Sequence, residues 1–238
     1  ESFLKSQQEE LFQFIRDQEA LKKWNLAKSK TIKSDFPKPY FYGKNNFGSL
    51  KVDPKGNFAT FRLIEDSERK NEKMEVFITA DGYNQIEDTK AKVSTDNLLA
   101  SKFGVYDIAK DSVYFVNFSS LSHIQDVPKY FELYEKSKTT EKKDKLIVVQ
   151  EPIYNENGSY AIAEIRSQDN KDRWIVSLNL KKGTFQELDH QHDEAWIGGP
   201  GIPSYSFGRG TLGFLGDNET VYFQSEETGY SHLYTYNL

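Results

Sequence analysis

The feature that most constrains the fold of this chain is a stretch near its end in which aromatic and β-branched residues alternate with polar ones. Polar turns at Gly216–Glu219 and Glu226–Gly229 each lead into an aromatic segment. Short alternating segments bounded by turn residues are typical of antiparallel strands. The sequence therefore predicts a β-hairpin here. Because no polar tail follows Leu238, we expect the natural protein to continue beyond it.

The composition agrees with a sheet protein. The 238 residues include 17 Phe and 14 Tyr, which favour pleated sheets over helix bundles. The length suits one large all-β domain or two smaller ones. A net charge of −5 leaves no basic field for a phosphate backbone, which argues against nucleic acid as a partner. The sequence has no cysteine for disulfides or thiolate metal sites, and no run of about 18 apolar residues that would predict a membrane span.

The chain begins with a different pattern. Apolar residues within residues 2–27 recur mainly at helical spacing among Glu, Gln and Lys, which predicts an amphipathic helix, or two. Residues 30–46 contain two prolines and three consecutive aromatic residues, a composition that suits an extended connector on a sheet edge. We therefore expect the helix and connector in residues 1–43 and the sheets in residues 44–238.

A unit of one polar turn and two strands recurs along the second part. Its copies align on four residues that are 57, 45 and 62 positions apart, namely Asp53, Lys110, Asn155 and Asp217. These steps resemble the blade period of a β-propeller with insertions. The sequence thus predicts an all-β fold, a partial or truncated β-propeller of about four blade-like units preceded by the amphipathic helix. The charged run within residues 127–145 is interpreted as a solvated insertion between blades.

Three motifs that resemble functional sites are better explained as structure. Residues 208–213 match a dinucleotide fingerprint but lead into a turn and a strand instead of a helix. Ser231 lies in a segment that lacks the final glycine of a nucleophile elbow, and no other position offers that motif. His190 and His192 would share one face of a strand, yet the other histidines have no fixed spacing to them. We therefore expect no catalytic residue, metal or cofactor in this chain.

The segment after these histidines is the best candidate for ligand contact. Residues 195–203 set a Trp-Ile pair among three glycines and two prolines, which predicts an irregular apolar loop. Such a loop either packs under the sheets or lines the mouth of a binding site. We take Asp193, Glu194 and Trp196 as the candidate substrate-binding residues.

Several segments resemble a known family. Residues 224–234 resemble a Ser-Glu-x-x-Gly-Tyr-x-His-Leu-Tyr signature in the N-terminal β-propeller of dipeptidyl peptidase IV-like members of the prolyl oligopeptidase family. Residues 172–175 and 193–201 look like segments of bacterial relatives in the same propeller. The blade-like pattern extends this resemblance to residues 44–238.

This resemblance implies a two-domain serine peptidase in a periplasmic or extracellular location. Its Ser-Asp-His triad would lie in an α/β-hydrolase domain outside this chain, so the chain alone would be inactive. The propeller of the family screens peptide substrates by size and helps to seat their amino termini. The family's paired-glutamate motif for that amino terminus is not recognisable here. Glu226 and Glu227 are not that pair, because they lie in a hairpin turn.

Two other functions are compatible with the residues. A free-standing propeller could bind a protein or a cell-envelope ligand through the loop that carries Trp196. A propeller hydrolase could act on carbohydrate through carboxylates near Asp193, a chemistry that requires a defined separation between two carboxyl groups. The residues encoded after Leu238 would discriminate, because a nucleophile elbow followed by Asp and His would indicate the peptidase.

Overall fold

The computed structural model of the chain describes residues 2–31, 36–66, 71–91, 99–133, 143–202 and 210–238. The chain divides into two compact units, residues 1–39 and 40–238. The first contains one helix, α1 (Ser2–Thr31), which confirms the predicted helix and extends it. Residues 3–30 are all exposed. In the described parts of the chain, no helix combines the length and the apolar character needed to cross a membrane.

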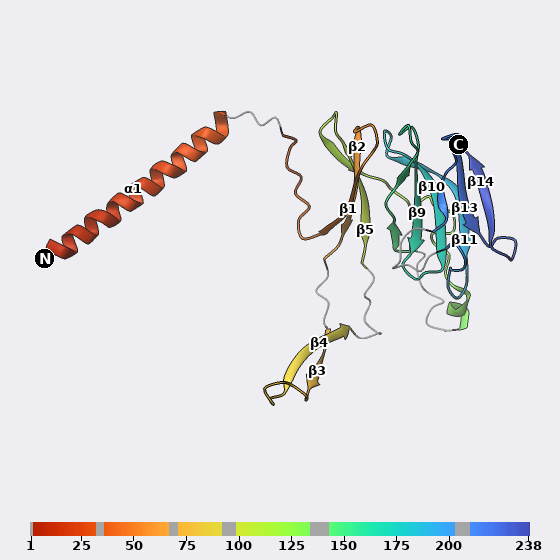
Figure 1. Cartoon of the computed structure of the whole chain (residues 1–238), viewed down its shortest axis with the longest axis horizontal. Coiled ribbons are helices and arrows are strands. Elements are labelled where there is room, and N and C mark those ends of the chain that lie inside the picture. The colour runs from red at the N-terminus through yellow and green to blue at the C-terminus, as the bar shows by residue number, and fades with distance from the viewer. Residues whose placement is uncertain (1, 32–35, 67–70, 92–98, 134–142, 203–209) are drawn as a thin grey trace. The chain divides into compact units, whose positions relative to one another are not determined.

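The second unit consists of antiparallel sheets (Figure 1). The first sheet has the order β1-β2-β5-β6, with bounds Asn46–Val52, Phe58–Ile64, Ser101–Asp107 and Ser112–Phe115. The middle sheet has the order β11-β10-β9-β7, with bounds Thr184–His192, Asp172–Asn179, Ala161–Ser167 and Ile147–Val149, and β8 (Ile153–Tyr154) also pairs with β9. The third sheet has the order β12-β13-β14, with bounds Leu212–Phe214, Thr220–Ser225 and His232–Asn237. A separate hairpin pairs β3 (Asn71–Val76) with β4 (Gln85–Ala91), and a 3-10 helix, η1, spans Lys129–Leu133.

The middle sheet lies between the other two large sheets and is covered on both faces (Figure 1). On one face, Trp174 of β10 packs in a core that includes Phe103 of β5. On the other face, Ile175 of β10 packs with Val221 of β13. Every residue of β9 is buried. The middle sheet therefore has no solvent face along its central strands.

Three charged residues of the middle sheet are buried with the apolar ones. Glu164, Arg166 and Arg173 are each at most 4% exposed. The third sheet covers the face of β9 and β10 that carries these charges. Glu164 accepts hydrogen bonds from Arg166 Nε (2.7 Å) and Arg173 Nε (2.9 Å). Arg173 Nη1 also donates to the carbonyl oxygen of Gln224 in β13 (2.9 Å), which links the middle and third sheets.

The structure corrects the predicted repeat. The turn at Lys110 joins β5 to β6, and both strands belong to the same sheet as β1 and β2. The turn at Lys110 therefore does not begin a second unit. The hairpin of β3 and β4 lies between β2 and β5 in the sequence but pairs outside their sheet. The described residues form three large sheets and one hairpin, none of them closed, instead of four equivalent units.

The closing hairpin is confirmed, since β13 pairs with β14 along its whole length and β12 pairs with β13. Two other expectations fall partly outside the described residues. Most of the charged run in residues 135–145 lies outside them, as do the first two residues of the glycine motif at 208–213. The described end of that motif leads into β12 and not into a helix, as we expected.

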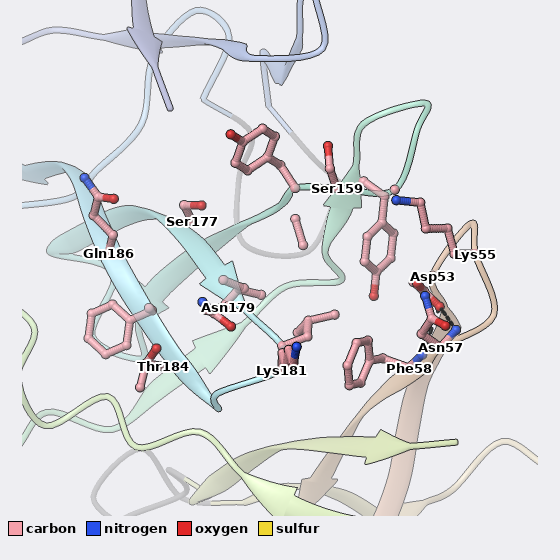
Figure 2. Close-up of a pocket in the computed structure, with 17 residues that line it drawn as sticks. Asp53, Lys55, Asn57, Phe58, Ser159, Ser177, Asn179, Lys181, Thr184 and Gln186 are labelled. Carbon is pink, nitrogen blue, oxygen red and sulfur yellow. Dashed lines mark hydrogen bonds between the residues drawn. The ribbon is translucent and has the colours of Figure 1, made fainter. Parts of the chain in front are cut away.

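Three turns meet at one end of the middle sheet and line a pocket of about 520 Å³, the turn pocket (Figure 2). They are the turns between β1 and β2, between β8 and β9, and between β10 and β11, and they contribute, among others, Lys55, Ser159 and Lys181. The pocket is therefore built by connections rather than by strand faces alone.

A glycine in β5 tests the packing of the first sheet. Gly104 lies opposite Phe61 of β2, and a Cβ built on Gly104 would meet three carbons of that ring closer than 3.0 Å. We expect Gly104→Ala to lower the free energy of unfolding by about 1–3 kcal/mol, because the ring has to move. Gly48→Ala is the control, since its Cβ would meet nothing within 4 Å. Urea unfolding measures both, and equal effects of the two substitutions would contradict this packing.

Candidate functional site

A shift of strand register determines which side chains of β11 face the first sheet. Val176 of β10 pairs with Glu187, but two residues earlier Trp174 pairs with His190. Between these pairs β11 contains one additional residue, Leu188, which makes a β-bulge. The alternation of side chains along β11 therefore changes phase at this point.

The change of phase brings two histidines to the face of β10 that carries Trp174. Without the bulge, the alternation of period two would present Asp189 and Gln191 on this face. With it, His190 lies opposite Trp174 and His192 lies opposite Asp172. The bulge thus decides the chemistry at this end of the sheet.

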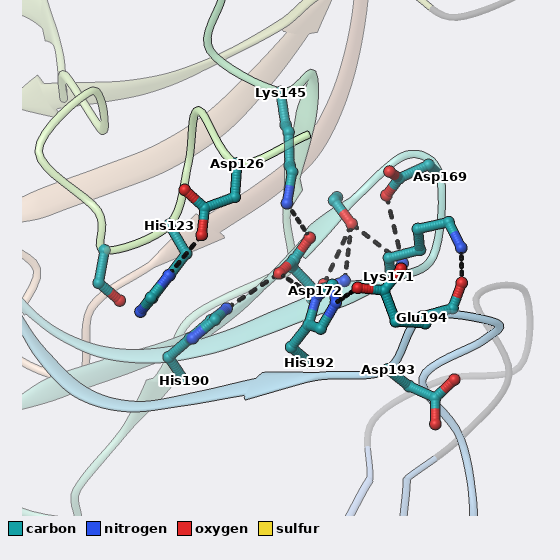
Figure 3. Close-up of polar contacts among 12 residues, drawn as sticks. His123, Asp126, Lys145, Asp169, Lys171, Asp172, His190, His192, Asp193 and Glu194 are labelled. Carbon is teal, nitrogen blue, oxygen red and sulfur yellow. Dashed lines mark hydrogen bonds and ion pairs between the residues drawn. The ribbon is translucent and has the colours of Figure 1, made fainter. Parts of the chain in front are cut away.

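Asp172 is the centre of a polar cluster (Figure 3). Its side chain is fully buried. Its Oδ1 lies 3.0 Å from His190 Nε2 and 2.9 Å from His192 Nδ1. Its Oδ2 accepts a hydrogen bond from the ammonium group of Lys145. Three basic side chains therefore converge on one carboxylate.

The surroundings of Asp172 keep it ionised. Burial by itself would raise the pKa of Asp172, but hydrogen bonds from His190, Lys145 and His192 lower that pKa to about 2. The ionised carboxylate balances the ammonium of Lys145, whose side chain is only 10% exposed. Carboxylate and ammonium thus depend on each other for their burial.

A loop before η1 adds a third histidine. The indole Nε1 of Trp174 donates to the carbonyl oxygen of Ser122 (2.9 Å), which fixes this loop on the middle sheet. His123 follows in a left-handed backbone conformation, with φ at 58°, and its ring stacks on that of His190 with centroids 4.8 Å apart. His123 Nδ1 lies 2.6 Å from Asp126 Oδ2, and this hydrogen bond lowers the pKa of Asp126.

The three histidines line a pocket of about 530 Å³, the histidine pocket, together with Glu194 and Lys129. Glu194 Oε2 accepts a hydrogen bond from the backbone N–H of Lys129 (3.2 Å), and Oε1 lies 3.4 Å from His192 Nε2. Desolvation would raise the pKa of Glu194, but these hydrogen bonds lower it. Its side chain is 40% exposed. Lys129 Nζ lies 3.8 Å from Glu194 Oε1, so this carboxylate is one that a cationic group can reach.

The other two predicted ligand residues have different surroundings. Asp193 Oδ1 accepts hydrogen bonds from the backbone N–H groups of Trp196 (2.8 Å) and Ala195 (2.7 Å), which close a turn and lower the pKa of Asp193. Figure 3 shows its side chain pointing away from the cluster. Trp196 is 54% exposed and does not line the histidine pocket. Only Glu194 of the three predicted residues reaches this pocket, and a role of all three in substrate binding stays a prediction.

Within the described residues, no group of three or more His, Cys, Asp and Glu side chains could hold a metal ion. Although His190 and His192 share a face, both of them contact the carboxylate of Asp172. Ser231 Oγ donates a hydrogen bond to the carbonyl oxygen of Pro200 (2.9 Å), in agreement with a structural role.

Sequence reasoning missed Asp172, Lys145 and His123 as members of the cluster. These residues come from separate segments, and only the bulge and the loop bring them together. The one available signal was the Asp-Arg-Trp-Ile segment at residues 172–175, which begins with the central carboxylate.

The comparisons with known proteins concern the fold. No protein-family model and no curated protein matches the sequence. The crystal structure of a protein assigned as a dipeptidyl aminopeptidase IV from Bacteroides ovatus matches with 14% identity and a TM-score of 0.50, covering 84% of this chain and 25% of that chain. The structure of Porphyromonas gingivalis dipeptidyl peptidase 4 matches with 11% identity and a TM-score of 0.52, covering 79% of this chain and 22% of that one.

These matches confirm the expected likeness to dipeptidyl peptidase IV at the level of the fold. The chain spans about a quarter of the length of the two proteins that it matches. It therefore has the fold of one part of them.

Asp172→Asn tests the mutual dependence of the buried charges. The substitution would leave the ammonium of Lys145 buried without its carboxylate. We expect the free energy of unfolding to fall by about 3–5 kcal/mol. Asp169→Asn replaces an exposed carboxylate in the preceding turn. This control should change the free energy of unfolding by less than about 1 kcal/mol. Urea unfolding of both variants is the measurement. If Asp172→Asn lowered the free energy of unfolding as little as Asp169→Asn does, Lys145 would not need Asp172.

The pKa of Asp172 predicts sensitivity to acid. A carboxyl group whose pKa falls from 3.8 to about 2 on folding stabilises the folded state above about pH 4. This contribution, about 2 kcal/mol, is lost as the pH falls towards about 2. The carboxyl carbon resonance of Asp172, followed by NMR, should titrate with a midpoint near pH 2. A midpoint at the ordinary value of 3.8 would be inconsistent with the cluster.

Proposed function

We propose that this chain is the non-catalytic propeller portion of a prolyl oligopeptidase-family serine peptidase. In this proposal it screens and positions peptide substrates for an α/β-hydrolase domain elsewhere in the same protein. The observation that carries the proposal is the likeness in fold to part of two bacterial dipeptidyl peptidase IV structures. On the same ground we propose a periplasmic or extracellular location.

Steric selection is the first element of the proposed mechanism. The three large sheets would be consecutive blades, and their packing against one another leaves little freedom to open. A ring of such blades around an enclosed triad would admit short or unfolded peptides and exclude folded proteins.

Substrate positioning is the second element. The amino terminus of a peptide has a pKa of about 8 and is largely cationic at neutral pH. Glu194 offers a half-exposed carboxylate at the edge of the histidine pocket, where Val127 and the ring of His123 add less polar surface. We propose that Glu194 receives the peptide ammonium group, with Asp193 and Trp196 beside it on the same loop.

The exposure of Trp196 favours a second candidate function, a free-standing propeller that binds a protein or a cell-envelope ligand. The indole is 54% exposed in a loop rich in glycine and proline. Under this alternative, Trp196→Ala would abolish partner capture without changing stability, and the full-length protein would hydrolyse no peptide.

Peptide length tests steric selection in the full-length protein. We expect a short fluorogenic peptide to be hydrolysed, and a folded protein that contains the same cleavable sequence in an exposed loop to be left intact. Unfolding that protein before the assay should restore cleavage. Cleavage of the folded protein at the rate of the short peptide would contradict the screening role.

Glu194→Gln tests substrate positioning. A hydrogen bond between charged groups is worth about 1.5–3 kcal/mol, so its loss should raise KM by about tenfold or more for a peptide with a free amino terminus. The N-acetylated form of the peptide should show no change. Glu156→Gln, in an exposed turn at the other end of the middle sheet, is the matched control. An equal rise in KM for both peptides would exclude contact with the ammonium group.

A further inference from the structure

The turn pocket lies at the opposite end of β10 from the histidine pocket. This strand begins at Asp172, in the polar cluster, and ends at Asn179, which lines the turn pocket. Its 8 residues of extended chain separate the two ends by about 20 Å. We propose that the turn pocket is a second binding site, for a peptide segment that carries a carboxylate beside an apolar side chain. This proposal does not depend on the proposed function.

The pocket is held in shape by the turns that form it. Asp53 Oδ1 accepts hydrogen bonds from the backbone N–H groups of Asn57 (2.6 Å) and Phe58 (2.9 Å) within its own turn. Side-chain oxygens of Asn155 and Asn179 close the other two turns in the same way. A ligand would therefore meet a preformed site and would not need to order three loops.

Positive charge remains available at the pocket. Lys55 and Lys181 line it from two different turns, and neither forms an ion pair with another described residue. The stem of Lys55 rests on the β8–β9 turn, since a Cβ on Gly158 would lie 3.2 Å from its Cγ. Asp53, the one acidic residue of the lining, is 7% exposed and is engaged by its own turn. Each of two separate turns thus offers an ammonium group to a carboxylate in the pocket.

The remaining lining suits the rest of a peptide. Phe58, Tyr154 and Phe185 are partly buried and pack against the main core, so they form a fixed apolar wall. Figure 2 shows Ser177 and Gln186 among the polar side chains of the lining, and such groups can pair with peptide amides. The volume of about 520 Å³ lies in the range of small-ligand pockets, roughly 300–1,000 Å³.

Other ligand classes use this lining less well. A neutral saccharide would engage rings and amides but carries no charge to pair with the two lysines. A phosphate group could pair with the two lysines, but it would leave the aromatic wall unused, and no arginine fork or helix N-terminus contributes to the lining of this pocket. A carboxylate on an apolar peptide segment uses the lysines, the aromatic wall and the amides together.

Fluorescence anisotropy on the full-length protein tests the proposal. The probe is a tetrapeptide that ends in phenylalanine and carries fluorescein on its amino terminus, which also blocks the ammonium group that the histidine pocket would receive. We expect the peptide with a free carboxylate to bind at least tenfold more tightly than its carboxamide. The double variant Lys55→Gln, Lys181→Gln should abolish this difference.

Two controls separate this site from its surroundings. Lys182→Gln removes a lysine in the same turn that does not line the pocket, and should preserve the tenfold preference. Glu194→Gln should also preserve the tenfold preference, so this test of the second site is independent of the proposed function. The proposal would be overturned by equal binding of acid and carboxamide, by equal losses of the preference in the double variant and in Lys182→Gln, or by displacement of the probe by inorganic phosphate or a neutral oligosaccharide.

Discussion

The burial of the middle sheet on both faces is the constraint on which the second unit depends. Strands without a solvent face need a partner on each side, and the first and third sheets supply those partners. The charged side chains can occupy such a position because Arg166 and Arg173 both pair with Glu164, and Arg173 also donates to the carbonyl oxygen of Gln224. Packing and ion pairs together join three sheets that are separate in their strand hydrogen bonding.

The polar cluster arises where this buried face ends. Along one face of β10 the side chains are Leu178, Val176 and Trp174, all in the main core, and then Asp172. The apolar face thus passes into a charged one within a single strand. Trp174 connects the two, because it packs in the core and also holds the loop that carries His123. The packing of the core therefore keeps the histidine pocket rigid.

Local patterns made α1 and the closing hairpin predictable from the sequence, since helical spacing and alternation between turns act over a few residues. The number of units was not predictable, because β2 pairs with β5 across an inserted hairpin and similar turns occur within one sheet and between sheets. Glu194, one of the three predicted ligand residues, lines the histidine pocket. Asp172 was not predicted, because its burial depends on a bulge and on a lysine that is distant in sequence.

The additional residue in β11 has a consequence for comparing and engineering chains of this kind. Deletion of Leu188 would restore simple alternation and turn Asp189 and Gln191 towards Asp172 in place of the histidines. Two carboxylates would then compete for one ammonium, and burial already raises the pKa of Asp189. Deleting this single residue would thus replace both imidazoles on this face of the sheet at once. An alignment that places its gap a few positions away would match each histidine to a residue on the opposite face, and would attribute the pocket to chains that lack it.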